Sequence, residues 1–374
     1  MTSSSAEMPD LHAVRHSGRG TTATIYLQKL RHNLAVFREL HHGPIIAVVK
    51  ADAYGHGLSR VVPVLHEVEA FAVATLEEAQ QVRALSRQHK IILLEGVFNA
   101  AELETAIEQR FDVVVHQDFQ LELIQQCQSA QSALNVWIKI DTGMNRLGFN
   151  AGELTEIRQQ LSHSAVINKV MLMTHFADSD HSDVVITQSQ VNKNQELIKD
   201  FESYSLSNTA AVLNGLSDPN EWVRLGIGLF GIKQAEQLEH TTSNLQPVMQ
   251  LSANILALKH VLSGHSIGYA ATYTAELDMQ IAIVGIGYAD GYPWRPQMTA
   301  HALINGQKCP LVGRVSMDML AVDVSALKDC AVGDEVILWG PELPTDKVAA
   351  ELKLIPYVLT CGITRRVKFV YVDE

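Results

Sequence analysis

Short runs of apolar residues recur along the first part of the chain. In the first of them, Ile45–Lys50, apolar and largely β-branched residues lead directly into a lysine. A run without alternation is typical of a strand that is buried on both faces, as in a parallel sheet. Eight such runs are predicted to be strands: Ile45–Lys50, Phe71–Leu76, Lys90–Gly96, Asp112–His116, Val136–Ile140, Lys169–His175, Ser205–Ala210 and Val223–Gly231.

Amphipathic helical patterns separate most of these strands. Apolar side chains recur at three- and four-residue spacing, for example at Val61, Leu65 and Val68. Eight strands that alternate with helices predict an α/β fold, a (β/α)8 barrel of the TIM type. An open doubly wound sheet is disfavoured, because the first strand is followed by Y-G-H-G and not by the dinucleotide fingerprint G-x-G-x-x-G.

The pattern changes after about residue 246. Longer strand-like runs follow, among them Val248–Val261 and Ile281–Ile286, and Asn305-Gly306 is a typical two-residue hairpin turn. We therefore predict a poorly ordered leader over residues 1–20, a barrel over residues 21–245 and a mainly β C-terminal domain over residues 246–374.

Composition and charge narrow the possible partners and compartment. The formal net charge of −12 and the pI of about 5.7 argue against nucleic acid or an anionic membrane as a partner. We find no run of about 18 apolar residues that would span a membrane, and no signal peptide in the first twenty residues. The four cysteines form no C-x-x-C pair, which is typical of reduced thiols. We expect a cytoplasmic protein.

The ends of the predicted strands carry candidate chemistry. In barrels of this type the reactive side chains lie at the carboxyl ends of the strands, which here carry Lys50, Lys139, His175, Asn208 and Arg224. Gly226 and Gly228 lie in the predicted eighth strand, Val223–Gly231, and would let backbone N–H groups approach an anion; the loops after strands seven and eight usually seat a phosphate in this fold. A lysine amine and a phosphate seat on one rim suggest pyridoxal phosphate held as a Schiff base. On the first run alone, Lys50 also fits a lysine that ends a strand and reaches water.

Six motifs, in this order, resemble those of the bacterial alanine racemases. They are A-V-V-K-A-D-A-Y-G-H-G, K-I-D-T-G-M-N-R-L-G-F, T-H-F-A, I-G-Y-A-A-T-Y-T-A, G-I-G-Y-A-D-G-Y and G-R-V-S-M-D. The resemblance covers nearly the whole chain from about Thr22. It implies a barrel that binds pyridoxal 5'-phosphate, a C-terminal β domain, and a head-to-tail homodimer whose active sites each need two chains.

The resemblance also assigns residues to roles. Lys50 and Tyr269 correspond to the two catalytic bases, and Lys139 to a lysine that is carbamylated in many members. Arg146, Met317 and Asp318 correspond to the substrate side, and no metal is implied. The residues assigned to the cofactor, with Asn208 added from its place on the rim, are Lys50, Tyr54, Arg146, His175, Asn208, Thr209, Arg224, Gly226, Ile227 and Tyr357.

The implied reaction interconverts L-alanine and D-alanine on a pyridoxal phosphate aldimine and supplies D-alanine for peptidoglycan. One base removes the Cα proton and the other returns a proton on the opposite face. A free tyrosine has a pKa of about 10, so Tyr269 needs a neighbour that accepts or stabilises its proton. His175, tied to Arg224, is the natural candidate.

Several alternatives stay open at the level of sequence. A broad-specificity or serine racemase would share the scaffold, and the physiological role could be biosynthetic or catabolic. A non-catalytic carrier of pyridoxal phosphate is disfavoured by the β domain, and a decarboxylase by the arginine at position 224. Tyr273 is the rival of Tyr269, and an ion pair with Asp141 is the alternative to carbamylation of Lys139. A metal site is disfavoured at His175, Asp178, Asp180 and His181, because such clusters after a strand are more often solvated caps.

Overall fold

The computed structural model describes residues 18–127, 134–180, 185–233, 244–294 and 300–373. Its contacts divide the chain into two compact units: Tyr26–Val248 with Tyr371–Glu374, called the barrel unit, and Met1–Ile25 with Met249–Val370, called the β unit. Most of the predicted leader and the candidate metal ligand His181 lie outside the described residues. The predicted domain limits at residues 21 and 246 remain predictions.

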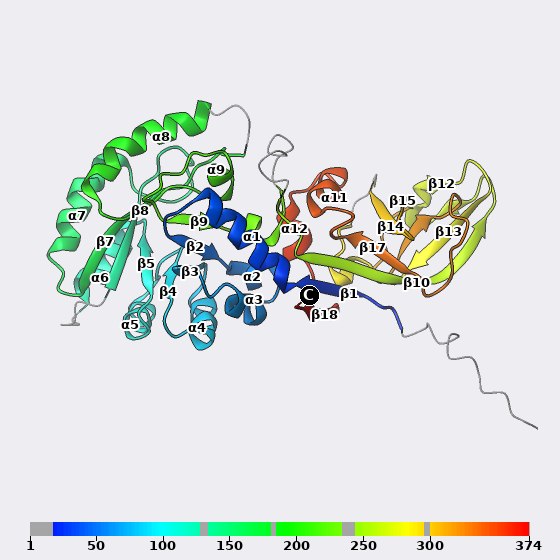
Figure 1. Cartoon of the computed structure of the whole chain (residues 1–374), viewed down its shortest axis with the longest axis horizontal. Coiled ribbons are helices and arrows are strands. Elements are labelled where there is room, and N and C mark those ends of the chain that lie inside the picture. Colours follow the sequence, from blue (N-terminus) through cyan, green and yellow to red (C-terminus); the bar gives the residue numbers. More distant parts are fainter. Residues whose placement is uncertain (1–17, 128–133, 181–184, 234–243, 295–299, 374) are drawn as a thin grey trace, which may run out of the picture. The chain divides into compact units, whose positions relative to one another are not determined.

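Eight parallel strands form the sheet of the barrel unit, in the order β8-β7-β6-β5-β4-β3-β2-β9 (Figure 1). A bridge between Asn208 and Arg224, next to β8 and β9, brings the two ends of the sheet together. The predicted (β/α)8 barrel is thereby confirmed. The strands are β2 (Ile45–Val48), β3 (Ala70–Val73), β4 (Lys90–Leu93), β5 (Asp112–Val115), β6 (Leu134–Lys139), β7 (Ile167–Met173), β8 (Tyr204–Ser205) and β9 (Val223–Leu225).

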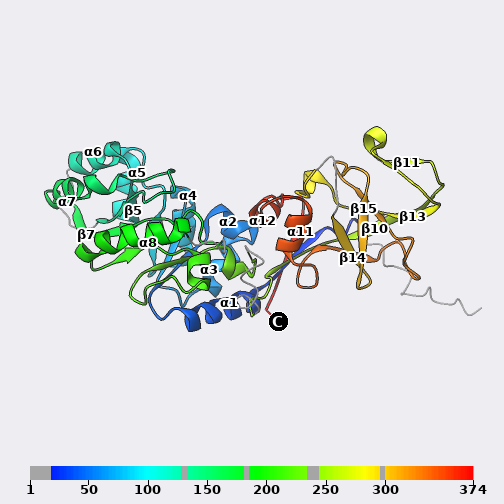
Figure 2. The same ribbon diagram turned by 90° about the horizontal axis from the view of Figure 1, so that it is seen from above.

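The apolar runs form these strands because each is enclosed on both faces. All residues of β2, β3 and β5 are buried, and the helices lie on the outer side of the sheet (Figure 2). The helices are α1 (Leu27–Leu40), α2 (Lys50–Gly55), α3 (Leu58–Val64), α4 (Leu76–Leu85), α5 (Ala100–Glu108), α6 (Asp118–Gln126), α7 (Leu154–Ser162), α8 (Val185–Leu197) and α9 (Thr209–Leu213), with the 3₁₀ helices η2 (Ala151–Glu153), η3 (Ile198–Asp200) and η4 (Ile227–Phe230).

The β unit is built on antiparallel strands, which confirms the predicted mainly β C-terminal part. Strand β10 pairs with both β13 and β17, so that β10, β13, β16, β15, β14 and β17 close into a ring. The strands are β1 (Thr22–Tyr26), β10 (Met249–Val261), β11 (Ser266–Ile267), β12 (Tyr273–Thr274), β13 (Met279–Val284), β14 (His301–Ile304), β15 (Gln307–Val312), β16 (Leu320–Asp323), β17 (Glu335–Trp339) and β18 (Lys368–Val372). The helical elements are α11 (Thr345–Glu351), α12 (Pro356–Cys361), η6 (Tyr269–Ala271) and η7 (Tyr288–Asp290).

The predicted hairpin at Asn305-Gly306 is confirmed. Ile304 pairs with Gln307 across the turn, and Asn305 and Gly306 have φ values of 49° and 74°. Two residues of positive φ match the right-handed twist of the flanking strands, which is why this dipeptide favours a hairpin.

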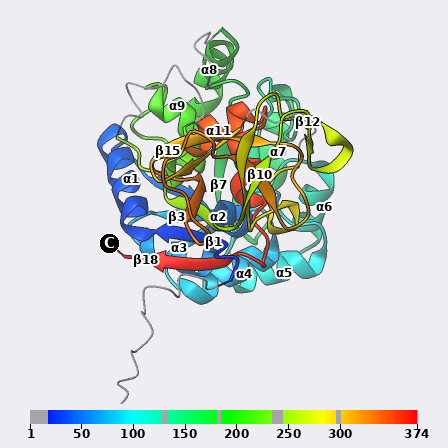
Figure 3. The same cartoon turned by 90° about the vertical axis from the view of Figure 1, so that its right-hand side faces the viewer.

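Strand β1, which precedes the barrel strands in the sequence, belongs to the sheet of the β unit. It pairs antiparallel with β10, from Thr22 with Ser252 to Ile25 with Met249, and it lies beside β18 (Figure 3). Ala23 and Ile25 are fully buried there. Among the described residues, we find no helix that is long and apolar enough to cross a membrane.

Candidate active site

Three predicted site residues lie at the carboxyl ends of barrel strands. Lys50 lies two residues after β2, His175 lies two residues after β7, and Arg224 lies within β9. Because the strands are parallel, these ends form one rim of the barrel. The charge of Lys50 contributes to the lowered pKa of His175, in keeping with this shared location.

The chain makes a left-handed turn directly after Lys50. Ala51, Asp52, Ala53 and Tyr54 all have φ between 52° and 55°. For residues other than glycine, this conformation costs about 1–2 kcal/mol per residue relative to the right-handed one. The turn is therefore strained, and surrounding contacts must offset that strain.

Hydrogen bonds hold the left-handed turn at both of its ends. The Asp52 carboxylate accepts the N–H of Leu58 at 2.6 Å, and the Asp52 carbonyl accepts the N–H of Gly57 at 3.0 Å. The N–H of Ala51, next to Lys50, donates to Glu78 Oε1 at 2.7 Å. These contacts select one backbone conformation for the residues that follow the lysine.

The Phe230 ring packs against two rings at the left-handed turn, those of Tyr54 and His56. The His56 ring stacks on Phe230 with ring centroids 4.3 Å apart, and the Tyr54 ring lies 5.3 Å from Phe230. Nδ1 of His56 donates toward the carbonyl oxygens of Ala53 and Tyr54, at 3.1 Å and 3.0 Å. Complete burial lowers the pKa of His56 to about 4, so the ring is neutral at neutral pH with its proton on Nδ1.

Tyr54 brings its hydroxyl group to the end of strand β9. A Cβ atom on Gly226 would lie 2.5 Å from Tyr54 Oη, so glycine is needed for this close approach. The N–H of Gly226 donates to Thr209 Oγ1 at 3.0 Å, and Ile227 begins η4. Asn208 caps α9 with its side chain. A phenol, a threonine hydroxyl and a glycine backbone, groups of the kind that can hydrogen-bond phosphate oxygens, are thus brought together.

Arg224 and His175 form a polar pair on the rim. Arg224 Nη2 donates to His175 Nδ1 at 3.0 Å and to Thr174 O at 2.7 Å, and Arg224 Nη1 donates to Ser205 O at 2.9 Å. Burial lowers the pKa of Arg224 to about 10, so the guanidinium stays charged at neutral pH. Burial and the nearby charge of Arg224 lower the pKa of His175 well below its usual value. The His175 ring is therefore neutral, with its proton on Nε2.

Lys139 is buried at the end of β6, with 8% of its surface exposed. Burial, followed by the charges of Arg224 and Arg146, lowers the pKa of Lys139 to about 7, while Asp141 opposes the shift. A large fraction of this amine is therefore uncharged at neutral pH. Arg146 is exposed in the loop after β6, and its charge contributes to the lowered pKa of both Lys139 and His175.

In the β unit, the two candidate tyrosine bases have different surroundings. Tyr269 is 71% exposed and begins η6, in which Ala270 and Ala271 have φ values of 58° and 49°. Tyr273 packs against a core cluster that includes Ile267, Ala275, Met279, Ile281 and Val312. Of the two, Tyr269 is the tyrosine that the β unit presents to the outside.

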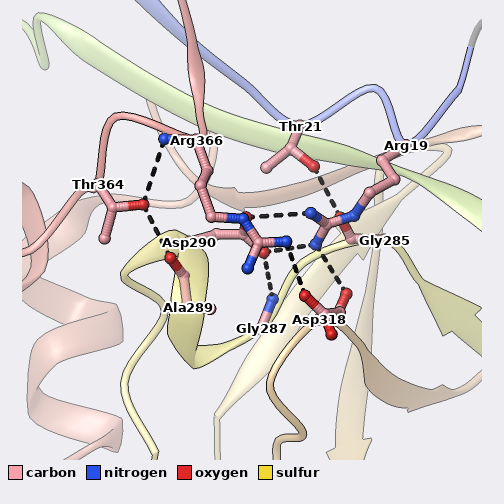
Figure 4. A network of polar contacts seen from close by, with 9 residues as sticks. All are labelled: Arg19, Thr21, Gly285, Gly287, Ala289, Asp290, Asp318, Thr364 and Arg366. Carbon is pink, nitrogen blue, oxygen red and sulfur yellow. Dashed lines mark hydrogen bonds and ion pairs between the residues drawn. The ribbon is translucent and has the colours of Figure 1, made fainter.

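Asp290 is the centre of a charged network in the β unit (Figure 4). Its side chain is fully buried, and it accepts a hydrogen bond from Arg19 Nη2 at 2.5 Å. Arg366 Nε lies 3.4 Å from Asp290 Oδ1, and the N–H of Gly287 donates to Asp290 Oδ2 at 2.9 Å. The buried carboxylate is thereby matched by two guanidinium groups and a backbone donor.

The same network fixes the loop of Met317 and Asp318. Arg366 Nη2 donates to Asp318 Oδ1 at 2.7 Å, and Arg19 Nη2 donates to the Asp318 carbonyl at 2.8 Å. The N–H of Ala289 donates to the Met317 carbonyl at 3.0 Å. The Met317 side chain remains 52% exposed. The backbone of the predicted substrate loop is thus anchored while its side chain stays accessible.

The remaining sequence candidates add little to the site. Tyr357 is half-buried at the start of α12, in the β unit. Across the described residues, we find no group of three or more histidine, cysteine, aspartate or glutamate side chains arranged to hold a metal ion.

The structure adds contacts around Lys50 that sequence reasoning missed. Glu78 accepts the N–H of Ala51, and Phe230 packs on both His56 and Tyr54. Thr75-x-x-Glu78 has the pattern of a helix-capping box, but that pattern does not predict the hydrogen bond between Glu78 and Ala51. His56 stands inside the Y-G-H-G motif, which could have drawn attention to it.

The groups on the rim fit pyridoxal phosphate. Lys50 would supply an amine for the aldehyde. Because Gly226 has no Cβ, the Tyr54 hydroxyl can lie close to its backbone. Arg224 supplies a donor that keeps its proton at neutral pH.

Family models match most of the chain. The alanine racemase N-terminal domain model matches residues 25–234, and the alanine racemase C-terminal domain model matches residues 248–371.

Individual relatives carry the same similarity over nearly their full length. An alanine racemase of Coxiella burnetii is 39% identical over 364 residues, covering 94% of this chain and 99% of the relative. The crystal structure of the biosynthetic alanine racemase from Pseudomonas aeruginosa has a TM-score of 0.92 at 40% identity, covering 95% of this chain and 100% of that one. An alanine racemase structure from Bartonella henselae with covalently bound pyridoxal phosphate has a TM-score of 0.86 at 26% identity, with 95% and 100% covered.

Proposed function

We propose, because this chain belongs to the alanine racemase family, that it interconverts L-alanine and D-alanine with pyridoxal 5'-phosphate as its cofactor. The observation that carries the proposal is the rim of the barrel unit, where Lys50 follows a buried strand, Tyr54 lies against Gly226, and Arg224 pairs with His175. The near-complete coverage of alanine racemases supports the choice of alanine.

In this proposal the barrel unit holds the cofactor. Lys50 would hold its aldehyde carbon, and Tyr54, Thr209, Gly226 and Ile227 would hold its phosphate. Asn208 fixes the start of α9, and the family resemblance adds Tyr357 as a further phosphate ligand. Arg146 contacts the phenolic oxygen and the substrate carboxylate. When bound, pyridoxal phosphate supplies an electron sink that acidifies the Cα–H bond of the amino acid.

Lys50 and Tyr269 move the proton at Cα from opposite faces in this proposal. One side chain removes the proton and the other donates one, so that the configuration inverts. The neutral His175 accepts a hydrogen bond from Arg224 at Nδ1 and keeps its proton on Nε2, so it would stabilise the Tyr269 phenolate by donating a hydrogen bond to it. Arg224 keeps its own proton and donates only hydrogen bonds to the cofactor's ring nitrogen. That arrangement limits the electron sink and favours return of the proton to Cα over transamination.

The decisive experiment uses purified protein with L-alanine in deuterated water. We expect loss of optical rotation together with entry of deuterium at Cα. Retained configuration without exchange would end the proposal. A parallel panel with L-serine and other amino acids measures breadth, and we expect the highest kcat/KM for alanine.

We further propose a cytoplasmic homodimer whose active sites combine Lys50 of one chain with Tyr269 and Met317 of the other. The exposure of Tyr269 supports this arrangement. The test mixes the inactive variants Lys50→Ala and Tyr269→Phe under conditions that exchange subunits. Composite sites give hybrid dimers with one intact site, so activity returns. If each site lay within one chain, both sites of the hybrid would stay defective and no activity would return.

Lys139 is proposed to carry a carbamate that orients Arg146. An uncharged amine is the form that reacts with carbon dioxide, and the lowered pKa of Lys139 makes that form available. Incubation with ¹³C-bicarbonate should give a carbamate carbon resonance in the parent chain and none in Lys139→Ala. A spectrum without that resonance would leave Lys139 as an ion-pair partner of Asp141.

D-alanine for peptidoglycan is the proposed physiological product. Expression in a bacterium that lacks alanine racemase should remove its requirement for added D-alanine. Continued dependence on D-alanine, with the protein present in the cells, would overturn this proposal.

A further inference from the structure

We propose that Glu78 is a positioning residue for Lys50: its carboxylate holds the left-handed turn that directs the lysine and Tyr54 toward the cofactor. The inference rests on the proposed function for the identity of that cofactor. Glu78 itself lies in the first turn of α4, after strand β3, and touches no reacting atom.

Both carboxylate oxygens of Glu78 accept hydrogen bonds from backbone N–H groups on the rim. Oε1 accepts the N–H of Ala51 at 2.7 Å, and Oε2 accepts the N–H of Ala74 at 3.0 Å. Ala51 follows strand β2 and Ala74 follows strand β3, and these strands pair in parallel, with Val48 opposite Ala72. One side chain therefore ties together the ends of two neighbouring strands.

The contact with Ala51 bears directly on Lys50. The N–H of Ala51 belongs to the peptide bond that joins it to Lys50, so fixing this group fixes the backbone next to the lysine. Ala51 is also the first of the consecutive left-handed residues that end at Tyr54. A charged acceptor makes a stronger hydrogen bond to N–H than a neutral one. Loss of this acceptor would let the strained turn relax toward ordinary backbone conformations.

Helix capping alone does not account for this geometry. Within the capping box, the Glu78 N–H donates to Thr75 Oγ1 at 3.3 Å, and Thr75 N–H donates to Glu78 Oε2 at 3.4 Å. The shorter contact to Ala51 joins a different segment of the chain. Capping and positioning are therefore separable by substitution.

The test uses four variants of the full chain. Glu78→Ala removes both acceptors, and Glu78→Gln keeps one oxygen. Glu77→Ala is the matched charge control, because Glu77 is an exposed carboxylate in the same first turn. Thr75→Ala is the capping control, because it weakens the capping box and leaves the contact between Glu78 and Ala51.

Binding of pyridoxal phosphate to cofactor-free protein is followed by visible absorbance and circular dichroism. We expect Glu78→Ala to raise the Kd about tenfold or more and to change the visible circular dichroism per bound cofactor at saturation, with Glu78→Gln intermediate. Glu77→Ala and Thr75→Ala should stay within about twofold of the parent Kd, although Thr75→Ala lowers the Tm. Parent-like Kd and dichroism in Glu78→Ala, with only a lowered Tm, would overturn the inference.

Amide hydrogen exchange of the cofactor-free chain separates this inference from the proposed function. Peptides that span residues 50–57 should exchange faster in Glu78→Ala than in Glu77→Ala. If the parent chain binds no pyridoxal phosphate, the proposed function fails. Faster exchange in Glu78→Ala would still support the role of Glu78 in holding the left-handed turn. If the exchange rate of residues 50–57 is unchanged in Glu78→Ala, Glu78 does not hold the turn, whether or not the cofactor binds.

Discussion

The turn after Lys50 and the loop of Met317 are both assigned to the proposed reaction, yet different forces hold them. In the barrel unit, the Lys50 turn has a strained backbone and is held by buried aromatic rings and by acceptors for backbone N–H groups. In the β unit, Met317 and Asp318 have no positive φ, and two arginines anchor their loop: Arg366 pairs with the Asp318 carboxylate, and Arg19 donates to the Asp318 carbonyl. A strained backbone needs directional, short-range contacts, whereas a relaxed loop can be positioned by charges.

Because different forces hold the two regions, each should respond to a different kind of perturbation. Changes in packing or in the protonation of buried groups should act on the Lys50 turn. Removal or screening of charges should act on the Met317 loop, because its arginines remain partly exposed to water.

Removal of the buried carboxylate should have the largest effect. Asp290→Ala leaves the N–H of Gly287 unsatisfied and removes the shared charged acceptor of Arg19 and Arg366, and loss of hydrogen bonds to such an acceptor costs about 3 kcal/mol. We expect the free energy of unfolding in urea to fall by that amount. Asp318→Ala is the matched control, since it removes only an exposed partner of Arg366 and should cost much less. Equal losses in both variants would contradict the central role of Asp290.

Acid should act on the Lys50 turn. The pKa of His56 is lowered from 6.5 to about 4 in the folded chain, so the unfolded chain binds more protons between these values. The stability contributed by neutral His56 is therefore complete above pH 6.5 and is lost as the pH falls to about 4, up to about 3 kcal/mol. Urea titrations across this range should show a flatter pH dependence for His56→Asn than for the parent. His163→Asn, the same substitution at an exposed position, provides the control for loss of a histidine side chain.

A methyl group at the phosphate seat should have an intermediate effect. In Gly226→Ala, the added Cβ would lie 2.5 Å from Tyr54 Oη, so the phenol must move. Overpacking of this kind costs about 1–3 kcal/mol of stability, and we expect weaker binding of pyridoxal phosphate as well. Gly152→Ala, at a position with nothing near the new Cβ, is the control. If Gly226→Ala leaves the affinity for pyridoxal phosphate unchanged, Tyr54 is not a ligand of the phosphate.

Salt should produce the smallest effect and distinguish the two regions most simply. Raising NaCl from 0.1 M to 1 M shortens the screening length from about 10 Å to about 3 Å. We expect the exposed pair of Arg366 with Asp318 to weaken, and hydrogen exchange of residues 316–319 to rise slightly. Exchange of residues 50–57 should not change. Faster exchange of residues 50–57 with no change in residues 316–319 would contradict the assignment of charge to the Met317 loop.

The sequence predicted the barrel well because its strands are buried on both faces. The apolar runs indicated all eight strands, and parallel pairing then placed Lys50, His175 and Arg224 on one rim. Two of the predicted ranges were wrong at their ends: Ser205–Ala210 shares only Ser205 with β8 and enters α9 at Thr209, and Val223–Gly231 is a strand only to Leu225 and continues as η4. The hairpin at Asn305-Gly306 was predictable for a local reason, since its two residues favour positive φ.

The left-handed turn was not predictable from its own residues. Alanine and tyrosine favour right-handed conformations, so the residue types at Ala51–Tyr54 do not predict a left-handed turn. It depends on Glu78 and Phe230, which are distant in sequence. Glu78 reaches Ala51 only because β2 pairs with β3, a long-range fact that a capping pattern does not contain.

Strand β1 has a consequence for the order in which the protein is made. Its partner β10 comes after the entire barrel sequence, so Thr22 leaves the ribosome long before Ser252 exists. At typical rates of 5–20 residues per second, the interval is on the order of tens of seconds. During that time the nascent chain displays an unpaired strand whose backbone N–H and C=O groups can pair with other chains. Strand β1 is thus synthesised before all the other strands that the structure describes, yet it is among the last of them to be paired.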